Sequence, residues 1–258
     1  MSRDLATAYD GRSVFISGGS SGVGAALGRM LAGYGAHVTL FGRSRERLDA
    51  VVADIAAAGG SALATAGDVR RSSDVDAAIG AALERFGALQ VAVANAGIGD
   101  RRLLEDLDDD SWNAYIDTNL TGAFWVCRAA GLRMRDAGGG SIVTVGSGLG
   151  LVGMKGQVAY CASKGGMVLM TKALAAELAP VVRVNCLAPG GIETPMTDDD
   201  FAVTGDAAAA RQRALDRVPL GRFASPEEIA GAIAYIGSDL FAYATGSVVS
   251  MDGGTTAV

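Results

Sequence analysis

The sequence predicts an α/β fold: a single doubly wound domain in which a parallel seven-stranded sheet carries helices on both faces. Short apolar runs alternate with amphipathic segments along the chain, and a continuous apolar run is typical of a strand buried on both faces. No linker, repeat or change of composition divides this series. Alternation of this kind predicts right-handed crossovers between parallel strands, and it predicts one domain over residues 1–258.

The elements follow from the local pattern. SVFIS (13–17) is expected to form the first strand, and the periodic segment 24–35, which ends at glycine, the first helix. A second strand (36–42) and a second helix (45–60) follow in the same way. Further strands are expected at 61–69, 88–97, 141–147, 181–190 and 247–254, with helical segments between them. Because parallel sheets bind ligands at the carboxyl ends of their strands, the loops after the strands are the candidate sites.

Composition excludes several classes of function. Half of the residues are hydrophobic, and the net charge of −6 comes without a basic block, which argues against nucleic acid as a partner. The N-terminal segment has no apolar signal core, and the uncharged run 138–154 is too short and too rich in glycine for a membrane helix. We therefore expect a soluble, cytoplasmic protein with no membrane partner.

The cysteines predict neither a metal site nor a disulfide framework. Cys127, Cys161 and Cys186 are widely spaced, and the single histidine, His37, does not complete a ligand set with them. We expect no metal, and we interpret the cysteines as small core residues in a reducing compartment. Cys161 is the alternative case, because it follows a tyrosine of interest and an exposed thiol is possible there.

The loop after the first predicted strand has the spacing Gly-x-x-x-Gly-x-Gly at Gly18, Gly22 and Gly24. Glycines here permit a tight turn and let the backbone approach a pyrophosphate, and the next helix offers free N–H groups to the phosphates. A purely structural glycine turn is the alternative. The position between the first strand and the first helix favours dinucleotide binding.

The end of the second predicted strand bears on the choice of dinucleotide. A site that prefers NAD usually has an acid there to bind the ribose 2′-hydroxyl, but this chain has Gly42, followed by Arg43. An arginine beside the ribose would bind a 2′-phosphate through charge-assisted hydrogen bonds. We therefore expect NADP(H) to be preferred, with NAD(H) possible. The alternative is a solvated Arg43, or one paired with Glu46.

One of the six tyrosines has lysine four residues later: Tyr160 and Lys164, in VAYCASK (158–164). Residues i and i+4 lie on the same face of a helix, so the ammonium is expected near the phenol, where it favours the phenolate. Chance matches to Tyr-x-x-x-Lys are frequent, and a half-buried tyrosine beside a solvated lysine is the alternative. The rest of the chain decides between them.

Seven motifs, in the same order, resemble those of the classical short-chain dehydrogenase/reductase (SDR) family over essentially the whole chain. They are SGGSSGVG (17–24), GDV (67–69), ANAG (94–97), NLTGAF (119–124), VGSG (145–148), YCASK (160–164) and PGGIET (189–194). Ser147 stands thirteen residues before Tyr160, which is the family's spacing. The resemblance implies a Rossmann-type fold and an oxidoreductase that interconverts a secondary alcohol and its ketone with a nicotinamide cofactor, which the Gly42–Arg43 pattern predicts to be NADP(H).

The resemblance also implies roles for the residues that match its motifs. Tyr160 is the expected general acid/base, Ser147 holds the substrate oxygen, and Lys164 bonds the nicotinamide ribose and, together with the oxidised nicotinamide, lowers the pKa of Tyr160. Asn119 anchors a water that links Lys164 to solvent. The residues expected to bind the cofactor are Gly18, Ser20, Ser21, Gly22, Val23, Gly24, Arg43, Asp68, Val69, Asn95, Ala96, Gly97, Tyr160, Lys164, Pro189, Gly190, Ile192 and Thr194. The cofactor half then covers about 12–150, and the catalytic and substrate-lid half about 151–258.

The chain departs from the family pattern in places. Ser17 stands where threonine is usual and Ala94 where asparagine is usual, so we expect local hydrogen bonds to be kept only in part. The turn 178–185 is one residue tighter than usual. The helices at 119–135 and 160–178 are rich in small and apolar residues, and the family pairs these helices, so the resemblance implies a homotetramer.

The substrate is expected under the segment 195–223. Its apolar residues Met196, Phe201 and Val203 suit a hydrophobic ketone or alcohol beneath a lid, and Asp198, Asp199 and Asp200 would disfavour an anion if they pointed inward. Leu149, Leu151 and Val152 are expected to add an apolar wall. One alternative is a 3-oxoacyl-carrier-protein reductase, which needs basic residues such as Arg133, Arg135 or Lys172 to dock an acidic carrier. The other is a catalytically idle dinucleotide-binding regulator, against which the four matched catalytic residues argue.

Overall fold

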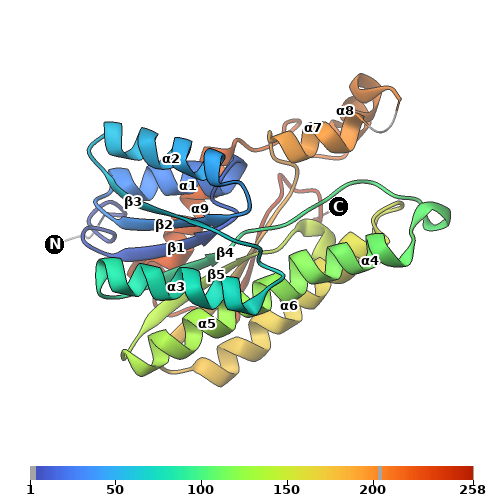
Figure 1. Cartoon of the computed structure of the whole chain (residues 1–258). Coiled ribbons are helices and arrows are strands. Elements are labelled where there is room, and N and C mark those ends of the chain that lie inside the picture. The colour runs from blue at the N-terminus through green and yellow to red at the C-terminus, as the bar shows by residue number, and fades with distance from the viewer. Residues whose placement is uncertain (1–3, 203–204, 258) are drawn as a thin grey trace.

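The computed structural model describes residues 4–202 and 205–257. Within them, seven parallel strands form one sheet, as the sequence predicts, and their order is β3-β2-β1-β4-β5-β6-β7 (Figure 1). The strands are β1 (Ser13–Ser17), β2 (His37–Gly42), β3 (Ser61–Ala66), β4 (Val91–Ala94), β5 (Gly140–Val145), β6 (Val182–Pro189) and β7 (Val248–Met251). The strand order reverses between β1 and β4, which is the place where doubly wound sheets bind ligands.

Helices cover both faces of the sheet. One face carries α1, α2 and α9, and the other carries α3, α5 and α6 (Figure 1). The α-helices are α1 (Gly22–Gly33), α2 (Arg45–Ala57), α3 (Ser72–Phe86), α4 (Asp109–Tyr115), α5 (Gly122–Asp136), α6 (Val158–Leu178), α7 (Pro195–Ala202), α8 (Ala207–Leu215) and α9 (Pro226–Gly237). A π-helical segment, η2 (Ile116–Thr121), joins α4 to α5, and short 3-10 turns are η1 (Leu104–Asp106), η3 (Gly148–Gly150) and η4 (Asp239–Phe241).

The central strands are buried on both faces, which explains their unbroken apolar sequence. In β1, Val14 and Ile16 pack into the core shared with α1 and α9, whereas Phe15 points to the opposite core beneath α3 and α5. All three side chains are fully buried. Burial of each contributes roughly 1.5–3 kcal/mol relative to exposure, so the strand is held from both sides.

Several predicted strands are shorter in the structure because the chain leaves the sheet where its neighbour ends. β3 stops at Ala66, and the Gly67 N–H then bonds the carbonyl of Gly42, the last residue of β2. β4 covers 91–94 instead of 88–97. Motif residues such as Asp68 and Asn95 therefore lie in loops at the carboxyl edge of the sheet, over which α7 and α8 project (Figure 1).

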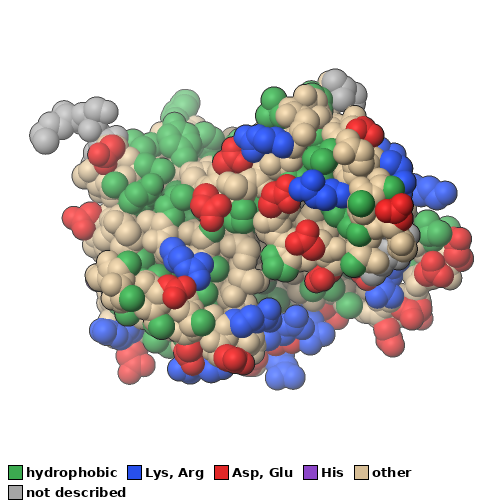
Figure 2. All heavy atoms as spheres, turned by 90° about the horizontal axis from the view of Figure 1, so that it is seen from above, with side chains coloured by type: hydrophobic (Ala, Val, Ile, Leu, Met, Phe, Trp, Pro, Cys, Tyr) green, Lys and Arg blue, Asp and Glu red, His purple; other side chains and the backbone are tan. Residues whose placement is uncertain are grey.

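The described residues contain neither a candidate membrane span nor a candidate metal cluster. In the described part of the chain, no helix is both long and apolar enough to cross a bilayer. The same residues contain no cluster of three His, Cys, Asp or Glu side chains suited to a metal ion. Figure 2 shows cationic and anionic side chains interspersed over one face of the molecule, without a continuous basic surface among the residues coloured there.

Candidate active site

The glycine loop after β1 leads directly into α1. The N-cap residue, Ser21, makes no side-chain capping hydrogen bond, so the first N–H groups of α1 keep their capacity to bind an anion. Gly24 has a packing role, because a Cβ there would lie 2.2 Å from the Gly18 carbonyl oxygen. The loop is thereby pressed against the helix, and its backbone faces the carboxyl edge of the sheet.

Ser17 fully uses its hydroxyl, contrary to the expectation that the exchange from threonine keeps local hydrogen bonds only in part. Its Oγ accepts the N–H groups of Asn95 and Ala96 at 3.0 and 3.1 Å and donates to the Val93 carbonyl at 3.3 Å. The Asn95 amide in turn donates to the carbonyls of Ser17 and Gly18 at 3.0 and 3.3 Å. These bonds join the loop after β1 to the loop after β4.

Three arginines line the same cleft as this loop: Arg43, Arg47 and Arg70. Arg70 is paired with Asp68, its Nη2 lying 2.6 Å from Oδ2, and this hydrogen bonding, with a smaller contribution from Arg43, lowers the pKa of Asp68. Arg43 forms no ion pair with Glu46 within the described residues. Arg43 was predicted from the sequence, whereas Arg47 and Arg70 belong to no motif and line the same cleft only through the fold.

The cleft has a volume of about 500 Å³. It is lined by Ser147 and by every residue expected to bind a cofactor except Gly24, which packs behind the loop. Asn119 also lies outside the lining. The predicted site residues that line the cleft are thus brought together from the loops after six strands, β1 to β6, and from α6, which a sequence cannot show directly.

Tyr160 and Lys164 lie one turn apart at the start of α6. Lys164 is 4% exposed, and its Nζ donates to the Val145 carbonyl at 2.8 Å while lying 5.7 Å from the centre of the Tyr160 ring. The solvated-lysine alternative is therefore wrong. Ser147 follows β5 and caps η3, its Oγ accepting the Leu149 N–H at 3.1 Å.

The close approach of η3 to α6 places Ser147 near Tyr160. A Cβ at Gly150 would lie 2.8 Å from the carbonyl carbon and oxygen of Lys164, so glycine is required for this contact. A hydrogen bond with Ser147 acts to lower the pKa of the Tyr160 phenol. The serine, the phenol and the amine thus surround one point at the edge of the sheet.

The pKa of Tyr160 is shifted in the direction opposite to the one expected. Burial raises it above its ordinary value, and Asp200 adds to the rise, against the opposing effect of Ser147. Burial also lowers the pKa of Lys164 to about 8, and its amine bonds Val145 rather than the phenol. The expected lowering combined Lys164 with the charge of an oxidised nicotinamide, and the chain's own groups do not produce it.

Asn119 is fully buried in the π-helical segment η2. Its Oδ1 accepts the Ile98 N–H at 2.8 Å, and its Nδ2 donates to the Ile98 carbonyl at 3.0 Å and to Ser163 Oγ at 3.2 Å. The expected helix from 119 therefore starts as a π-helix, which often marks functional sites. The side chain fixes the loop after β4 against α6.

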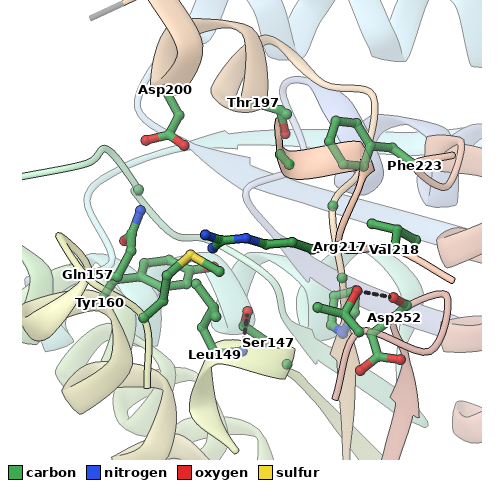
Figure 3. A pocket seen from close by; sticks show the side chains of 18 of the residues that line it. Ser147, Leu149, Gln157, Tyr160, Thr197, Asp200, Arg217, Val218, Phe223 and Asp252 are labelled. Carbon is green, nitrogen blue, oxygen red and sulfur yellow. Dashed lines mark hydrogen bonds between the residues drawn. The ribbon is translucent and has the colours of Figure 1, made fainter. Parts of the chain in front are cut away.

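A second cavity, of about 280 Å³, lies beneath the lid formed by α7 and α8 (Figure 3). Met196, Phe201 and Leu149 line it, as expected, and Val203 lies outside the described residues. Leu151 and Val152 do not line it; they are 43% and 42% exposed, because the chain turns away after η3.

The lid has a small apolar core of its own, in which Phe201 and Phe223 stack with centroids 6.0 Å apart and Val218 packs beside them. Of the three acids, Asp200 faces the cavity, whereas Asp199 lines the first cleft.

Polar groups also line this cavity. The Gln157 side chain is 7% exposed, and its Oε1 has no hydrogen-bond partner among the described residues. Three arginines, Arg101, Arg213 and Arg217, border it as well. These cations carry no motif spacing, and the sequence argument missed them.

The two cavities meet at Ser147 and Tyr160, which line both. A molecule in the second cavity and another in the first would therefore touch at the phenol and the serine hydroxyl. This is the arrangement needed for transfer between two bound molecules with a proton donor at the contact.

The sequence profile of the family described as short chain dehydrogenase matches residues 12–203. The chain belongs to the short-chain dehydrogenase family. The 3-oxoacyl-acyl-carrier-protein reductase FabG of Thermotoga maritima is 38% identical over 95% of this chain and 98% of its own. The cis-4-hydroxycyclohexanecarboxylate dehydrogenase of Sinomonas cyclohexanicum is 38% identical over 98% and 100%. Among solved structures, levodione reductase superposes with a TM-score of 0.93 at 32% identity, covering 96% and 99% of the two chains.

This short-chain dehydrogenase is accordingly an oxidoreductase that acts on CH–OH groups with NAD(P). The first cleft fits such a dinucleotide by its own features. The uncapped N-terminus of α1 suits the pyrophosphate, the arginines suit the adenosine end, and Tyr160 and Lys164 lie at the other end.

Proposed function

We propose that the chain is an NADP(H)-dependent oxidoreductase that interconverts a secondary alcohol and its ketone, with Tyr160 as the general acid/base. The observation that carries the proposal is the meeting of the two cavities at Tyr160 and Ser147. The cofactor-binding residues are those that line the first cleft, and the substrate occupies the second. The part up to about residue 150 serves the cofactor, and the rest supplies catalysis and the lid.

In ketone reduction, Tyr160 donates its phenolic proton to the carbonyl oxygen, and the Ser147 hydroxyl donates a hydrogen bond to the same oxygen as negative charge develops there. A raised pKa keeps the phenol protonated at neutral pH, which suits the acid role. When bound, the nicotinamide supplies or accepts the hydride. In alcohol oxidation, Tyr160 must first lose its proton and then accepts one from the hydroxyl.

Lys164 is suited to move that proton. Its pKa of about 8 lets the amine gain and lose a proton near neutrality, and its position at the Val145 carbonyl keeps it inside the cleft. We assign the nicotinamide ribose to it as a binding partner. Asn119 acts as a positioning residue through Ile98, and the water relay expected of it stays a prediction.

The preference for NADP(H) rests on the arginines at the adenosine end. Gly42 leaves no carboxylate to repel a 2′-phosphate, and Arg43 and Arg47 line the cleft beside the Arg70–Asp68 pair. Guanidinium groups bind phosphate oxygens through paired, charge-assisted hydrogen bonds. NAD(H) fits the same cleft but lacks the 2′-phosphate with which the arginines would form these hydrogen bonds.

Assembly is proposed to be a homotetramer that pairs α5 and α6 across symmetry axes. Leu132 on α5 and Leu169 on α6 are 42% and 68% exposed, which leaves apolar side chains for a partner copy to cover.

A 3-oxoacyl-carrier-protein reductase is the second candidate, favoured by the names of the FabG relatives. Two of the cations suggested for carrier docking are already engaged, since Arg133 pairs with Asp76 and Arg135 with Asp136. We therefore favour a small ketone or alcohol.

The test is a screen of ketones and alcohols with NADPH and NADH, followed by the absorbance of the reduced nicotinamide. The panel includes cyclohexanone, 4-oxocyclohexanecarboxylate and acetoacetyl-CoA. Turnover of a small ketone, abolished by Tyr160→Phe, supports the proposal. Turnover of the acetoacetyl thioester alone supports the second candidate, and cofactor binding without turnover of any compound supports an idle regulator.

A further inference from the structure

Two arginines on the lid face the substrate cavity without a partner. Arg213 on α8 and Arg217 just after it line the cavity, and neither side chain forms an ion pair or hydrogen bond with any residue that the structure describes. Arg211, on the same helix, differs: it pairs with Glu193, and its guanidinium lies over the Phe223 ring at 5.3 Å. Arg211 is thus held by contacts within the protein, whereas Arg213 and Arg217 line the cavity.

Arg217 extends into the cavity. Figure 3 shows its side chain extending across the cavity, with the guanidinium directed toward the side that holds Tyr160 and Gln157. Much of the surrounding surface is apolar, with Leu149, Met196 and Phe223 among its members. Arg213 and Arg217 are both exposed residues, so each guanidinium is open to a bound anion, with which it can form charge-assisted hydrogen bonds.

Residues 4–202 and 205–257 supply no carboxylate that pairs with Arg217. Asp200 is one of the two carboxylates in the lining, and its Oδ1 has no hydrogen-bond partner among the described residues. The charged groups that shift the pKa of Asp200 are Arg101 and Asp100, and Arg217 is not one of them. Asp252, the other acid in the lining, is occupied by hydrogen bonds from Gly254 and Thr256.

The phosphates of the cofactor do not supply that partner either. Arg43, Arg47 and Arg70 line the first cleft, whereas Arg213 and Arg217 line the second and are absent from the first. The two cavities touch at Ser147 and Tyr160, so an anion at Arg217 belongs to the molecule whose oxygen reacts at Tyr160. The lid cations therefore act on the substrate.

We propose that the substrate is an organic acid: a ketone or secondary alcohol that carries, away from the reacting carbon, a carboxylate or a sulfonate bound by Arg217 with support from Arg213. This rests on the proposed function and names its substrate class. The guanidinium fork matches two oxygens of either group. Because the anion lies away from the reacting carbon, its binding is the same in ground and transition states, and its loss raises KM while leaving kcat nearly unchanged.

The experiment compares Arg217→Gln and Arg213→Gln with Arg211→Gln as the matched control on the same helix. Each variant reduces 4-oxocyclohexanecarboxylate, the corresponding sulfonate and the uncharged carboxamide. We expect Arg217→Gln to raise KM for the preferred acid about 10- to 100-fold and KM for the carboxamide less than about threefold. Arg211→Gln should change KM for the acid and KM for the carboxamide by the same factor, because a loosened lid weakens the binding of charged and uncharged compounds equally. The ratio of the KM values for the carboxylate and the sulfonate identifies which anion the site prefers.

A binding measurement separates this inference from the proposed function. The thermal unfolding midpoint is followed with cyclohexanecarboxylate, cyclohexanesulfonate or cyclohexanecarboxamide added. A rise with an acid in the wild type that is lost in Arg217→Gln supports the inference even where no ketone is reduced, in which case the proposed reaction fails alone. Equal responses to acid and carboxamide, or an unchanged response in Arg217→Gln, overturn the inference, whatever the reductase activity.

Discussion

The preference for NADP(H) gives the most direct test of the cofactor cleft, through Gly42→Asp combined with Arg43→Gln. A Cβ at position 42 would lie 3.6 Å from Ser20 Oγ and 3.9 Å from Leu48 Cδ2, which are ordinary contacts, so an aspartate fits without displacing the loop. Its carboxylate would then stand at the end of β2, where it can accept hydrogen bonds from ribose hydroxyls and repel a 2′-phosphate.

The size of the effect follows from the bonds removed. One charge-assisted hydrogen bond contributes about 1.5–3 kcal/mol, which corresponds to about 10- to 100-fold in affinity. Arg43→Gln alone should weaken NADPH binding by about tenfold, because Arg47 and Arg70 still line the cleft. The double variant adds repulsion and should bind NADH more tightly than NADPH.

Titration of both reduced cofactors, followed by their fluorescence, measures the dissociation constant of each cofactor for the wild type and for each variant. Arg45→Gln is the control, since Arg45 pairs with Asp49 on the surface of α2 and does not line the cleft. Tighter binding of NADH than NADPH by the wild type, or an equal loss for both cofactors in Arg43→Gln, would refute the assignment of Arg43 to the phosphate.

Three further outcomes are expected. Tyr160→Phe removes the proton donor and should lower the rate by 10²–10⁴-fold with nearly unchanged cofactor affinity, and retention of more than about a hundredth of the rate argues against the acid/base role. Met134→Ala opens a cavity under α5, where Met134 is fully buried, and should lower the free energy of unfolding in urea by about 2–5 kcal/mol; a loss below about 1 kcal/mol contradicts this packing. Light scattering at micromolar concentration should show a tetramer, and a monomer contradicts the pairing of α5 and α6.

The features that the sequence predicted well are those with a local physical cause. The apolar run of β1 identifies a strand buried on both sides, because Val14, Phe15 and Ile16 serve two cores at once. The cleft could be foreseen because most of its motifs follow a strand, and parallel strands bring their carboxyl ends to one edge. The Tyr160–Lys164 spacing likewise has a local meaning on one helix.

The features that were missed depend on contacts between distant segments. Lys164 bonds Val145, nineteen residues earlier, and this rather than the helix spacing directs its amine. Arg47 and Arg217 belong to no motif and become relevant only through the cavity that each lines. The π-helical turn at Asn119 has no signal in composition, since it is defined by which backbone groups pair.

Asp200 provides a test of the lid that depends on pH. Burial and repulsion from Asp100 raise its pKa above the ordinary 3.8, against the attraction of Arg101. Because the folded pKa exceeds the unfolded one, the folded chain binds the proton more tightly. The carboxyl's stabilising contribution is thus present at pH below about 4 and is lost as the pH rises through the folded value.

Asp200→Asn should therefore melt at a higher temperature than the wild type near pH 8, with the difference shrinking toward pH 4. Because Asp200 is partly exposed, the corresponding difference in the free energy of unfolding is less than about 1 kcal/mol. Asp198→Asn, an exposed neighbour on α7, is the control, and a difference that is independent of pH or appears in both variants contradicts the assignment.

Asp200 and Tyr160 line one cavity with Arg217, so ionised Asp200 also opposes the binding of an anionic substrate. KM for such a substrate should rise with pH in the wild type and stay flatter in Asp200→Asn, which links the charge on the lid to the choice of substrate.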